Sequence, residues 1–466
     1  MTTPLWTSAE LEKVLKAKAG ARFDVAGVSI DSRSVGEGDL FVALAGPSHD
    51  GHAFVADAFA AGAAAALVHA DGAYPGPTIR VEDTLAALST LGAAGRTRAA
   101  RTKVVGVTGS VGKTGTKEML GAILADQGAT HISRGSHNNH WGVPLTLARL
   151  PRDSVYAVQE MGMNHTGELA ALTRIARPDV AVITTVGPAH LEHFGDLAAI
   201  VAAKCEIFEG LTSGGTAVLP ADHAFFGTME SAAKAAGAAN VITFGAAESA
   251  DLRLLSARVV ALETRVEAEI GGQAVEFSLP FIGRHWAMNS LAALGAAIAA
   301  GADPARAIET LSAIRVPDGR GAITEVATDG GAFVLLDESY NANPQSLEAA
   351  IDALAAIANV RQMYGTGRAI AVLGDMFELG PTARALHRQV AQQLAAREVD
   401  RLFACGELMR SAYDAAPDAM RAAFADDAAA LVAPLAAEIR PGDIVMIKGS
   451  HGMRMDRIVA ALKARP

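Results

Sequence analysis

The residues with the clearest chemical meaning form a glycine-rich stretch at 108–114, TGSVGKT. A β-branched run precedes this stretch and a helical pattern follows it, which predicts a strand, a loop and a helix in that order. Such a loop directs several backbone N–H groups at one point, and the start of the helix adds partial positive charge. Lys113 would reach the outer phosphates of a nucleotide, and the Thr114 hydroxyl would be placed to bind Mg²⁺. Val107 stands where the strict motif has glycine, so the match is to a shorter GxxGKT variant, with an ordinary glycine turn as the weaker alternative.

Two further polar side chains follow apolar runs that are typical of buried strands. The run at 155–159 ends at Glu160, and the run at 180–186 leads to His190. Ligands of open parallel sheets bind beyond the carboxyl ends of the strands. We therefore expect Glu160 and His190 near the phosphate loop as metal ligands, since Mg²⁺ is usually held by one or two carboxylates together with phosphates and water. A buried structural histidine is the alternative for His190.

Other candidates stay open when only the residues are considered. Lys204 precedes Glu206 on a predicted helix, where a surface ion pair is the favoured interpretation. The polar loop at 337–346, DESYNANPQS, is either a proline turn or a nucleotide contact in which Asp337 accepts from ribose hydroxyls and Tyr340 stacks on a base. Arg320 and Lys448 adjoin glycines, and each either neutralises phosphate or carboxylate or lies at the surface.

The pattern of elements predicts how these residues are positioned. A chain of 466 residues is long for one core, and strand and helix patterns alternate along it, as in α/β folds. We expect three domains: a small N-terminal α/β domain at 1–101, a central P-loop domain with a doubly wound, mostly parallel sheet at 102–316, and a C-terminal Rossmann-like α/β domain at 317–466. Residues 252–279 show the alternating pattern of extended strands, which predicts an antiparallel excursion of the chain. The turn-rich stretch at 31–55 is either a connector or a binding loop.

Composition excludes several classes of protein. The net charge of −10 argues against broad nucleic-acid binding. No run approaches the roughly 20 apolar residues of a membrane span, and the N-terminus lacks the apolar core of a secretory signal. Cys205 and Cys405 lie far apart in the sequence and give neither a disulfide framework nor a metal-ligand spacing. We therefore expect a cytoplasmic protein.

Taken together, these stretches resemble the Mur ligase family, the ATP-dependent amide ligases that build the peptidoglycan stem peptide. Several long matches in the order typical of the family carry the resemblance, and they extend over nearly the whole chain. The matching stretches are TGSVGKT at 108–114, SHNNHWGVP at 136–144, EMG at 160–162, VGPAHLEHFG at 186–195, AKCEIF at 203–208 and GRHWAMNSLAAL at 283–294.

Three further stretches are most similar to the family member that adds D-alanyl-D-alanine: DSRSV with GDLFVAL at 31–44, DESYNANP at 337–344 and VLGDMFELG at 372–380. This resemblance implies a monomeric enzyme that uses ATP and two Mg²⁺ ions to join UDP-MurNAc-tripeptide to D-Ala-D-Ala through an acyl phosphate. The ligase for the third amino acid, a folylpolyglutamate synthase and a P-loop switch without ligase activity stay as alternatives. The third residue of the tripeptide, diaminopimelate or lysine, also stays open.

The resemblance also implies roles for matching residues. Lys204 becomes a candidate carbamate that helps to hold a second Mg²⁺, which reverses the ion-pair interpretation. His451 and Cys205 depart from the arginine and glycine that many relatives carry at these positions. The implied catalytic residues are Lys113, Glu160, His190 and Lys204, and the implied metal ligands are Thr114, Glu160, His190 and carbamylated Lys204. ATP would contact Gly109, Ser110, Val111, Gly112, Lys113, Thr114, Gly115, Asn289, Arg320, Asp337, Tyr340 and Asn341. The UDP-linked substrate would contact Ser32, Arg33, Phe41, Ala43, Gly46, Asp50, His52, Asn138 and Asn139.

Overall fold

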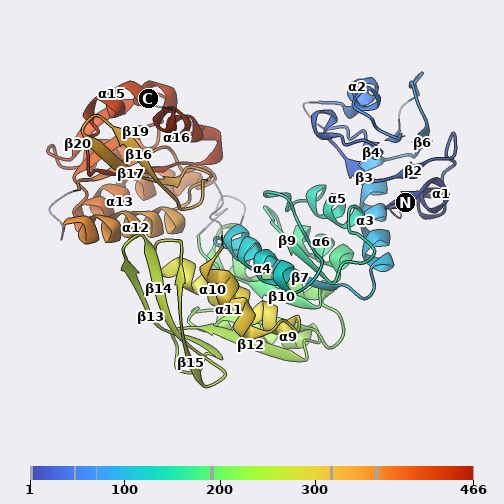
Figure 1. Ribbon diagram of the computed structural model, residues 1–466, viewed down its shortest axis with the longest axis horizontal. Helices are drawn as coiled ribbons and strands as arrows, with labels where there is room; N and C mark the ends of the chain where they lie inside the picture. The colour runs from blue at the N-terminus through green and yellow to red at the C-terminus, as the bar shows by residue number, and fades with distance from the viewer. Residues whose placement is uncertain are drawn as a thin grey trace.

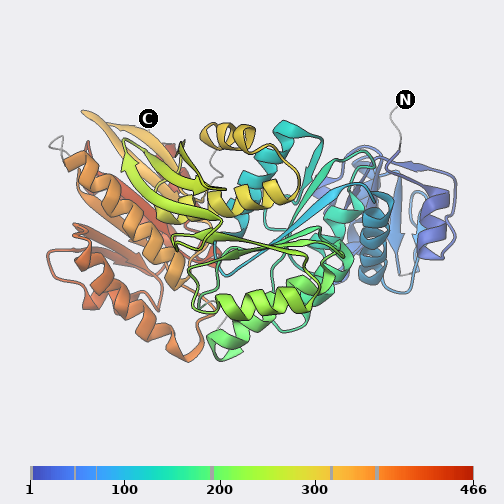
Figure 2. The ribbon, with the colours of Figure 1, turned by 90° about the horizontal axis from the view of Figure 1, so that it is seen from below.

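The computed structural model of the protein describes residues 4–46, 49–69, 71–188, 194–314, 319–362 and 367–464. Three main sheets follow one another along the chain, and each is covered by helices on both faces. The central part lies between the N-terminal part, blue in Figure 1, and the C-terminal part, orange to red. Figure 2 shows the same order along the long axis of the molecule. The predicted α/β class with three domains is confirmed.

The N-terminal part contains a four-stranded parallel sheet in the order β3-β4-β5-β6. Apolar side chains of α1 and α3 pack on one face of this sheet, and α2 packs on the other. The elements are β1 (Trp6–Thr7), α1 (Ser8–Leu15), β2 (Asp24–Val25), β3 (Gly27–Ser29), β4 (Asp39–Val42), α2 (Val55–Ala60), β5 (Ala65–Val68), β6 (Thr78–Arg80) and α3 (Thr84–Arg98).

Helix α3 connects the N-terminal sheet to the central part by packing on α5 (Gly142–Ala148). The two helices approach closely at Gly95, where a Cβ atom would lie 2.1 Å from the carbonyl oxygen of Leu147. The Trp6 indole N–H donates to the Ala148 carbonyl at 2.9 Å across the same junction. The N-terminal sheet is therefore joined to the central part through the contact between α3 and α5.

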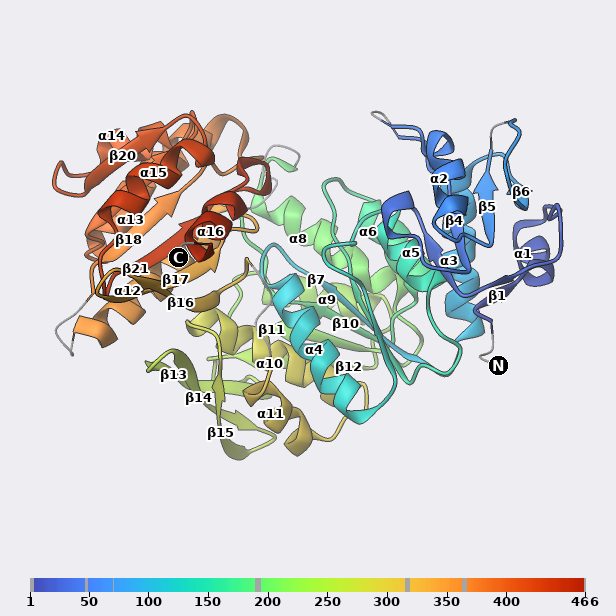
Figure 3. The same ribbon diagram turned by 45° about the horizontal axis from the view of Figure 1, so that its top comes forward.

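The central sheet has nine strands in the order β15-β14-β13-β12-β11-β10-β7-β9-β8. Strands β7 to β13 pair in parallel, and β13, β14 and β15 form the predicted antiparallel excursion. Helices α4, α10 and α11 cover one face (Figure 3), and α5, α6, α8 and α9 cover the other. The further elements are β7 (Lys103–Thr108), α4 (Lys113–Gln127), β8 (Thr130–Ile132), β9 (Tyr156–Glu160), α6 (Glu168–Ala176), β10 (Val180–Ile183), α8 (Leu197–Cys205), β11 (Thr216–Pro220), α9 (Phe226–Ala235), β12 (Asn240–Gly245), β13 (Leu252–Val260), β14 (Glu263–Ile270), β15 (Gln273–Leu279), α10 (Arg284–Ala299) and α11 (Pro304–Ser312).

The C-terminal sheet has six strands in the order β16-β17-β21-β18-β19-β20, all parallel except for the β16–β17 hairpin. Helices α12 and α13 pack on one face, and α15 and α16 pack on the other. The elements are β16 (Ala322–Thr328), β17 (Gly331–Glu338), α12 (Pro344–Gln362), β18 (Ala369–Leu373), α13 (Ala383–Ala396), β19 (Arg401–Cys405), α14 (Arg410–Ala415), β20 (Arg421–Ala425), α15 (Ala428–Glu438), β21 (Ile444–Lys448) and α16 (Asp456–Lys463).

One strand end differs from the prediction. The sequence pattern ends the first C-terminal strand at Leu336, whereas β17 continues to Glu338. Successive side chains of a strand face opposite sides of the sheet, so Asp337 and Glu338 have different surroundings. The predicted domain boundary at 316 and 317 lies outside the described residues. Within the described part of the chain, no helix is both long and apolar enough to cross a membrane.

Candidate active site

A cavity of about 1130 Å³ lies between the central and C-terminal parts. The central part contributes the loop before α4, the end of β9 and one face of α10. The C-terminal part contributes residues 319–320, the loop after β17 and the end of β21. The carboxyl ends of parallel strands from two sheets thus face one space, which is the usual position of ligand sites in such folds.

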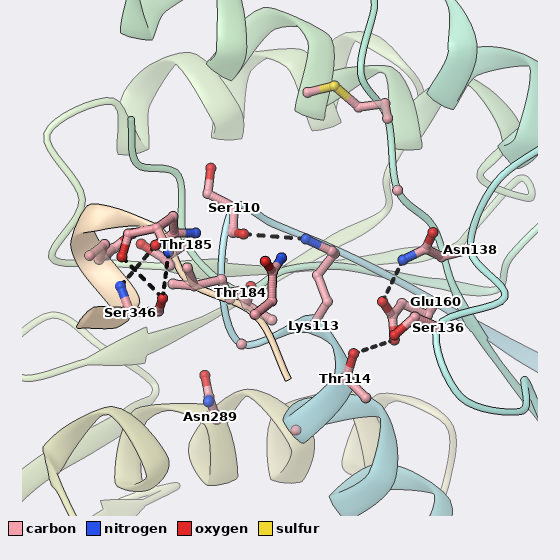
Figure 4. A pocket seen from close by; sticks show the side chains of 18 of the residues that line it. Ser110, Lys113, Thr114, Ser136, Asn138, Glu160, Thr184, Thr185, Asn289 and Ser346 are labelled. Atoms are coloured by element: carbon pink, nitrogen blue, oxygen red, sulfur yellow. Dashed lines mark hydrogen bonds between the residues drawn. The ribbon is translucent and has the colours of Figure 1, made fainter. Parts of the chain in front are cut away.

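The predicted phosphate loop joins β7 to α4. Gly112 has φ of +82°, and a Cβ atom there would lie 2.5 Å from the side-chain oxygen of Asn289 on α10, so this position requires glycine. The Lys113 ammonium donates to the carbonyl oxygens of Gly109 at 2.6 Å and Ser110 at 3.3 Å, and it points along the loop in Figure 4. Burial lowers the pKa of Lys113, and the negative charge of Glu160 opposes this shift. An anionic phosphate would offer this ammonium a stronger acceptor than the two carbonyls.

Glu160 is the last residue of β9 and is 1% exposed. One carboxylate oxygen accepts from the Thr114 hydroxyl at 2.7 Å, and the other accepts from the Asn138 amide at 2.7 Å (Figure 4). The structure therefore brings Thr114 and Glu160 together beside the phosphate loop. Both offer oxygen ligands, which suit Mg²⁺ better than a softer metal.

A metal ion at this position would need ligands beyond these two side chains. In the described ranges, no group of three or more His, Cys, Asp or Glu side chains could hold a metal. Phosphate oxygens and water would complete the shell, as is common for Mg²⁺. His190, the other predicted metal ligand, lies outside the described residues.

Lys204 lies near the end of α8 and is 1% exposed. Burial is the main cause that lowers its pKa well below the ordinary value, and the positive charge of Lys113 adds to the effect. Glu206 does not pair with it, because the Glu206 carboxylate accepts the backbone N–H groups of Gly167 at 2.7 Å and Ala170 at 3.1 Å at the start of α6. The ion pair favoured from the residues alone is therefore wrong. Among the described residues, the Lys204 amine has no hydrogen-bond or ion-pair partner.

Arg320 and Tyr340 reach from the C-terminal part to a residue that the sequence did not single out. The Arg320 guanidinium lies 3.9 Å from the centre of the Tyr340 ring. Both side chains donate to the hydroxyl oxygen of Ser136, from Tyr340 Oη at 2.7 Å and from Arg320 Nη2 at 3.2 Å. Ser136 begins the polar stretch 136–144, but nothing in its spacing indicates a contact between domains.

Asp337, which was predicted to contact the nucleotide, makes hydrogen bonds within the C-terminal part. Its carboxylate is 3% exposed and accepts from the Ser339 hydroxyl at 2.6 Å and the Gly319 N–H at 3.2 Å. The next residue, Glu338, lines the cavity and pairs with Lys448 at 3.4 Å. Burial raises the pKa of Glu338 and lowers the pKa of Lys448.

The remaining members of the predicted nucleotide set, Asn289 and Asn341, line the cavity. Lys448 donates to the Asn341 carbonyl at 2.9 Å, which fixes the loop after β17 against the end of β21. Asn138 and Asn139 also line the cavity, and the Asn139 side chain accepts the Gly142 N–H at 3.0 Å at the start of α5. These four residues thus share one cavity.

The other residues predicted to contact the UDP-linked substrate lie in the N-terminal part and differ in accessibility. Phe41 and Ala43 are 1% and 0% exposed and belong to the core. Arg33 is exposed and pairs with Asp31 at 2.7 Å. Ser32 lies beside it in a short 3₁₀ turn, and Gly46 is exposed.

Asp50 and His52 are held together beyond the carboxyl ends of β4 and β5. His52 Nδ1 lies 2.6 Å from the Asp50 carboxylate, and His52 Nε2 accepts the His69 N–H at 3.0 Å. Because Nε2 is an acceptor, the ring proton is on Nδ1 and is donated to Asp50. The pair therefore has a fixed orientation before any ligand binds.

His285 at the start of α10 gives the fold a dependence on pH. Burial lowers the pKa of His285 to about 4, and the charge of Lys448 adds to this shift. Between the unfolded pKa of about 6.5 and the folded one, only the unfolded chain takes up the proton, so stability falls as the pH falls through this range. The loss due to His285 reaches about 3 kcal/mol near pH 4.

Urea unfolding at pH 7, 6 and 5 checks this prediction. His285→Gln should show a shallower loss of stability with acid than the unchanged protein. Part of the slope should persist, because burial also lowers the pKa values of His131, His137 and His387. Equal slopes for the two proteins would contradict the assignment to His285.

Comparison with known proteins gives full-length matches. Three family models match: the Mur ligase middle domain over residues 107–297, the glutamate ligase domain of Mur ligases over 319–451 and the catalytic domain of the Mur ligase family over 24–96. The UDP-N-acetylmuramoyl-tripeptide--D-alanyl-D-alanine ligase of Bacillus subtilis (strain 168) is 34% identical, over 94% of this chain and 93% of the relative.

Solved structures give the same result. A crystal structure of MurF from Acinetobacter baumannii has a TM-score of 0.85 and 30% identity, over 99% of both chains. A crystal structure of MurF ligase from Thermotoga maritima in complex with ADP has a TM-score of 0.78 and 27% identity, over 94% of this chain and 97% of that chain. The similarity thus extends over all three main sheets.

Proposed function

The chain belongs to the Mur ligase family, and from this premise we propose that it joins D-alanyl-D-alanine to UDP-MurNAc-tripeptide at the expense of ATP. One observation carries the proposal: a phosphate loop, a buried carboxylate on a strand end and the strand ends of a second α/β sheet line one cavity. The full-length similarity to proteins named for this reaction supports the choice of substrates.

The chemistry explains why ATP is needed. A carboxylate is a poor electrophile because its negative charge is delocalised. Transfer of the terminal phosphoryl group of ATP to the end carboxylate of the tripeptide gives an acyl phosphate and ADP. The amino group of D-Ala-D-Ala then attacks the acyl carbon, an amide bond forms, and inorganic phosphate and a proton are released.

The residues of the cavity are suited to the first step, in which two anions must approach each other. Lys113 and the N–H groups of residues 109–114 would stabilise the phosphates as charge gathers on them. Thr114 and Glu160 would hold one Mg²⁺, and His190 and a carbamylated Lys204 would help to hold a second. When bound, Mg²⁺ would neutralise phosphate charge and orient the transferring group.

The three domains would divide the remaining tasks. The N-terminal domain, 1–101, would hold the UDP group through residues such as Ser32, Arg33 and the Asp50–His52 pair. The central domain, 102–316, would hold the ATP phosphates, and Asn289, Arg320 and Asn341 would contact adenosine. The C-terminal domain, 317–466, would bring the dipeptide to the acyl phosphate and exclude water. We propose that the enzyme works as a cytoplasmic monomer.

Phosphate release measured with each substrate omitted in turn tests the proposed function. We expect full release only when ATP, UDP-MurNAc-tripeptide and D-Ala-D-Ala are all present, with the pentapeptide product identified by mass spectrometry. Tripeptides that end in diaminopimelate and in lysine are assayed in parallel. Phosphate release that is equally fast with and without D-Ala-D-Ala, while the UDP-linked tripeptide is present, would contradict the proposal. It would favour a nucleotide switch or a different ligase.

Lys204→Ala tests the proposed carbamate. A neutral amine is the form that reacts with CO₂, and the lowered pKa of buried Lys204 favours that form. We expect turnover to fall by about 100-fold, the upper range for the loss of a residue that supports a metal site. Short-chain carboxylates such as acetate should restore part of it, because they can occupy the position of the carbamate.

Lys234→Ala provides the control for this prediction. Lys234 lies on α9 and pairs with Glu230 on the exposed surface, so its loss should leave turnover unchanged with or without acetate. A fully active Lys204→Ala protein would remove Lys204 from the mechanism.

A further inference from the structure

We propose that Ser136 is a positioning residue that holds the C-terminal domain in its working place over the phosphate loop. Its hydroxyl oxygen accepts from Tyr340 at 2.7 Å and from Arg320 at 3.2 Å, and both donors belong to the C-terminal part. A serine hydroxyl can accept two hydrogen bonds at once. One small side chain of the central domain thus receives two donors from the opposite side of the cavity.

The segment that carries Ser136 is fixed to the phosphate-loop helix. Lys117 on α4 is 0% exposed, and its ammonium donates to the carbonyl oxygens of Ser133 and Gly135, both at 2.9 Å. The same ammonium pairs with the Glu118 carboxylate at 2.7 Å. A buried ammonium is costly unless such partners satisfy it, so these contacts constrain the segment. The position of Ser136 therefore follows the position of α4.

The same segment is also tied to the candidate metal ligand. The Ser133 hydroxyl accepts the Glu160 N–H at 3.3 Å, and two residues beyond Ser136 the Asn138 amide donates to the Glu160 carboxylate at 2.7 Å. Figure 4 shows Ser136, Asn138 and Glu160 on the same side of Lys113. Any ligand that orders Thr114 and Glu160 would thereby order the acceptor for the C-terminal domain.

The contacts of Tyr340 agree with this role. Arg320 covers one face of its ring at 3.9 Å, and its hydroxyl is directed to Ser136. A base that stacked on that face would have to displace Arg320. Tyr340 therefore contributes a contact between the two domains.

A double-mutant cycle of Ser136→Ala and Tyr340→Phe tests the proposal. Tyr340→Phe keeps the ring beneath Arg320 and removes only the hydroxyl. For domain position, dyes on cysteines introduced at Glu248 and Glu407, whose side chains are 91% and 82% exposed, report energy transfer between the central and C-terminal domains. Both native cysteines are buried. The measurements are made with a non-hydrolysable ATP analogue and Mg²⁺.

We expect Tyr340→Phe to lower the ratio of docked to undocked molecules by roughly fivefold, the effect of one lost hydrogen bond. Ser136→Ala should lower this ratio by at least as much, because it also removes the acceptor for Arg320. Because both changes remove the same contact, the double variant should be little worse than Ser136→Ala. Turnover should fall by a similar factor, while affinity for UDP-MurNAc-tripeptide stays unchanged. Ser89→Ala is the matched control, since its hydroxyl donates only to Leu85 within α3 at 3.1 Å.

Two results would overturn the proposal. One is unchanged energy transfer in Ser136→Ala. The other is a double variant in which the ratio of docked to undocked molecules falls by the product of the two single effects. The turnover readout rests on the proposed function, whereas the energy-transfer readout requires only nucleotide. If the protein without substitutions forms no pentapeptide, the proposed function is refuted. The role of Ser136 is then decided by the energy-transfer measurement alone.

Discussion

Replacing Lys113 by methionine is expected to lower turnover by about 10³-fold or more, the scale on which a single cation acts in phosphoryl transfer. The Lys113 ammonium lies at the phosphate loop within reach of two loop carbonyls, so it is placed to stabilise the charge that gathers on the terminal phosphate. Initial rates under saturating substrates measure the effect. Affinity for UDP-MurNAc-tripeptide should stay nearly unchanged, because the proposed UDP site is in the N-terminal domain.

The stability of this variant separates a lost charge from a lost fold. Burial lowers the pKa of Lys113, so the folded protein holds this ammonium at a cost, and methionine should leave the midpoint of urea unfolding equal or higher. Lys234→Met on the exposed surface of α9 is the matched control. An equal loss of turnover and of UDP-substrate binding would mean that the central domain is unfolded.

Glu160→Gln is expected to lower turnover by about 10²–10³-fold, which corresponds to several kcal/mol of transition-state stabilisation. The change keeps the shape of the side chain but removes the negative charge that suits Mg²⁺. The neighbouring hydroxyl of Thr114 can rotate to accept from the new amide, so the local hydrogen bonds can persist.

A titration with Mg²⁺ makes this second prediction specific. The Mg²⁺ concentration that gives half-maximal activity should rise for Glu160→Gln. It should stay constant for Glu230→Gln, in which a half-buried carboxylate on α9 is changed. Unchanged activity at both limiting and saturating Mg²⁺ would show that Glu160 is not a ligand of the metal.

The parts of this site that the sequence predicts are those set by local pattern and by the geometry of parallel sheets. The strand, loop and helix around Lys113 follow from neighbouring residues. Glu160 ends β9, which pairs in parallel with β7, so its place beside Thr114 follows once both strand ends are located. Each of these predictions required only a short segment and one general rule.

Other parts depend on register and burial, which the residue pattern does not contain. The pattern ends strand β17 two residues too early, at Leu336, and it does not single out Glu338, which lines the cavity. Phe41 and Ala43 belong to a matching stretch, but residues 40–43 are all buried, and Phe41 and Ala43 pack in the core on one face of the N-terminal sheet. The Lys204–Glu206 pair could have been rejected, since residues two apart on a helix do not face each other.

The long-range contacts could not be predicted at all. The Ser136–Tyr340 contact joins residues 204 positions apart, and it arises only when two separately folded sheets meet. In the sequence, Lys117 has the pattern of an ordinary charged residue on a helix. In the structure, its ammonium is fully enclosed and donates to backbone carbonyls. Contacts of this kind depend on the tertiary arrangement rather than on local propensity.

The central claim is that the phosphoryl group of ATP is transferred to the end carboxylate of the tripeptide before the amide bond forms. Tripeptide labelled with ¹⁸O in that carboxylate tests the claim directly, because one carboxylate oxygen leaves with the phosphate when the amine attacks. Mass spectrometry should detect one ¹⁸O atom in the inorganic phosphate for each pentapeptide formed. Phosphate that carries no label, released together with pentapeptide, would contradict the acyl phosphate.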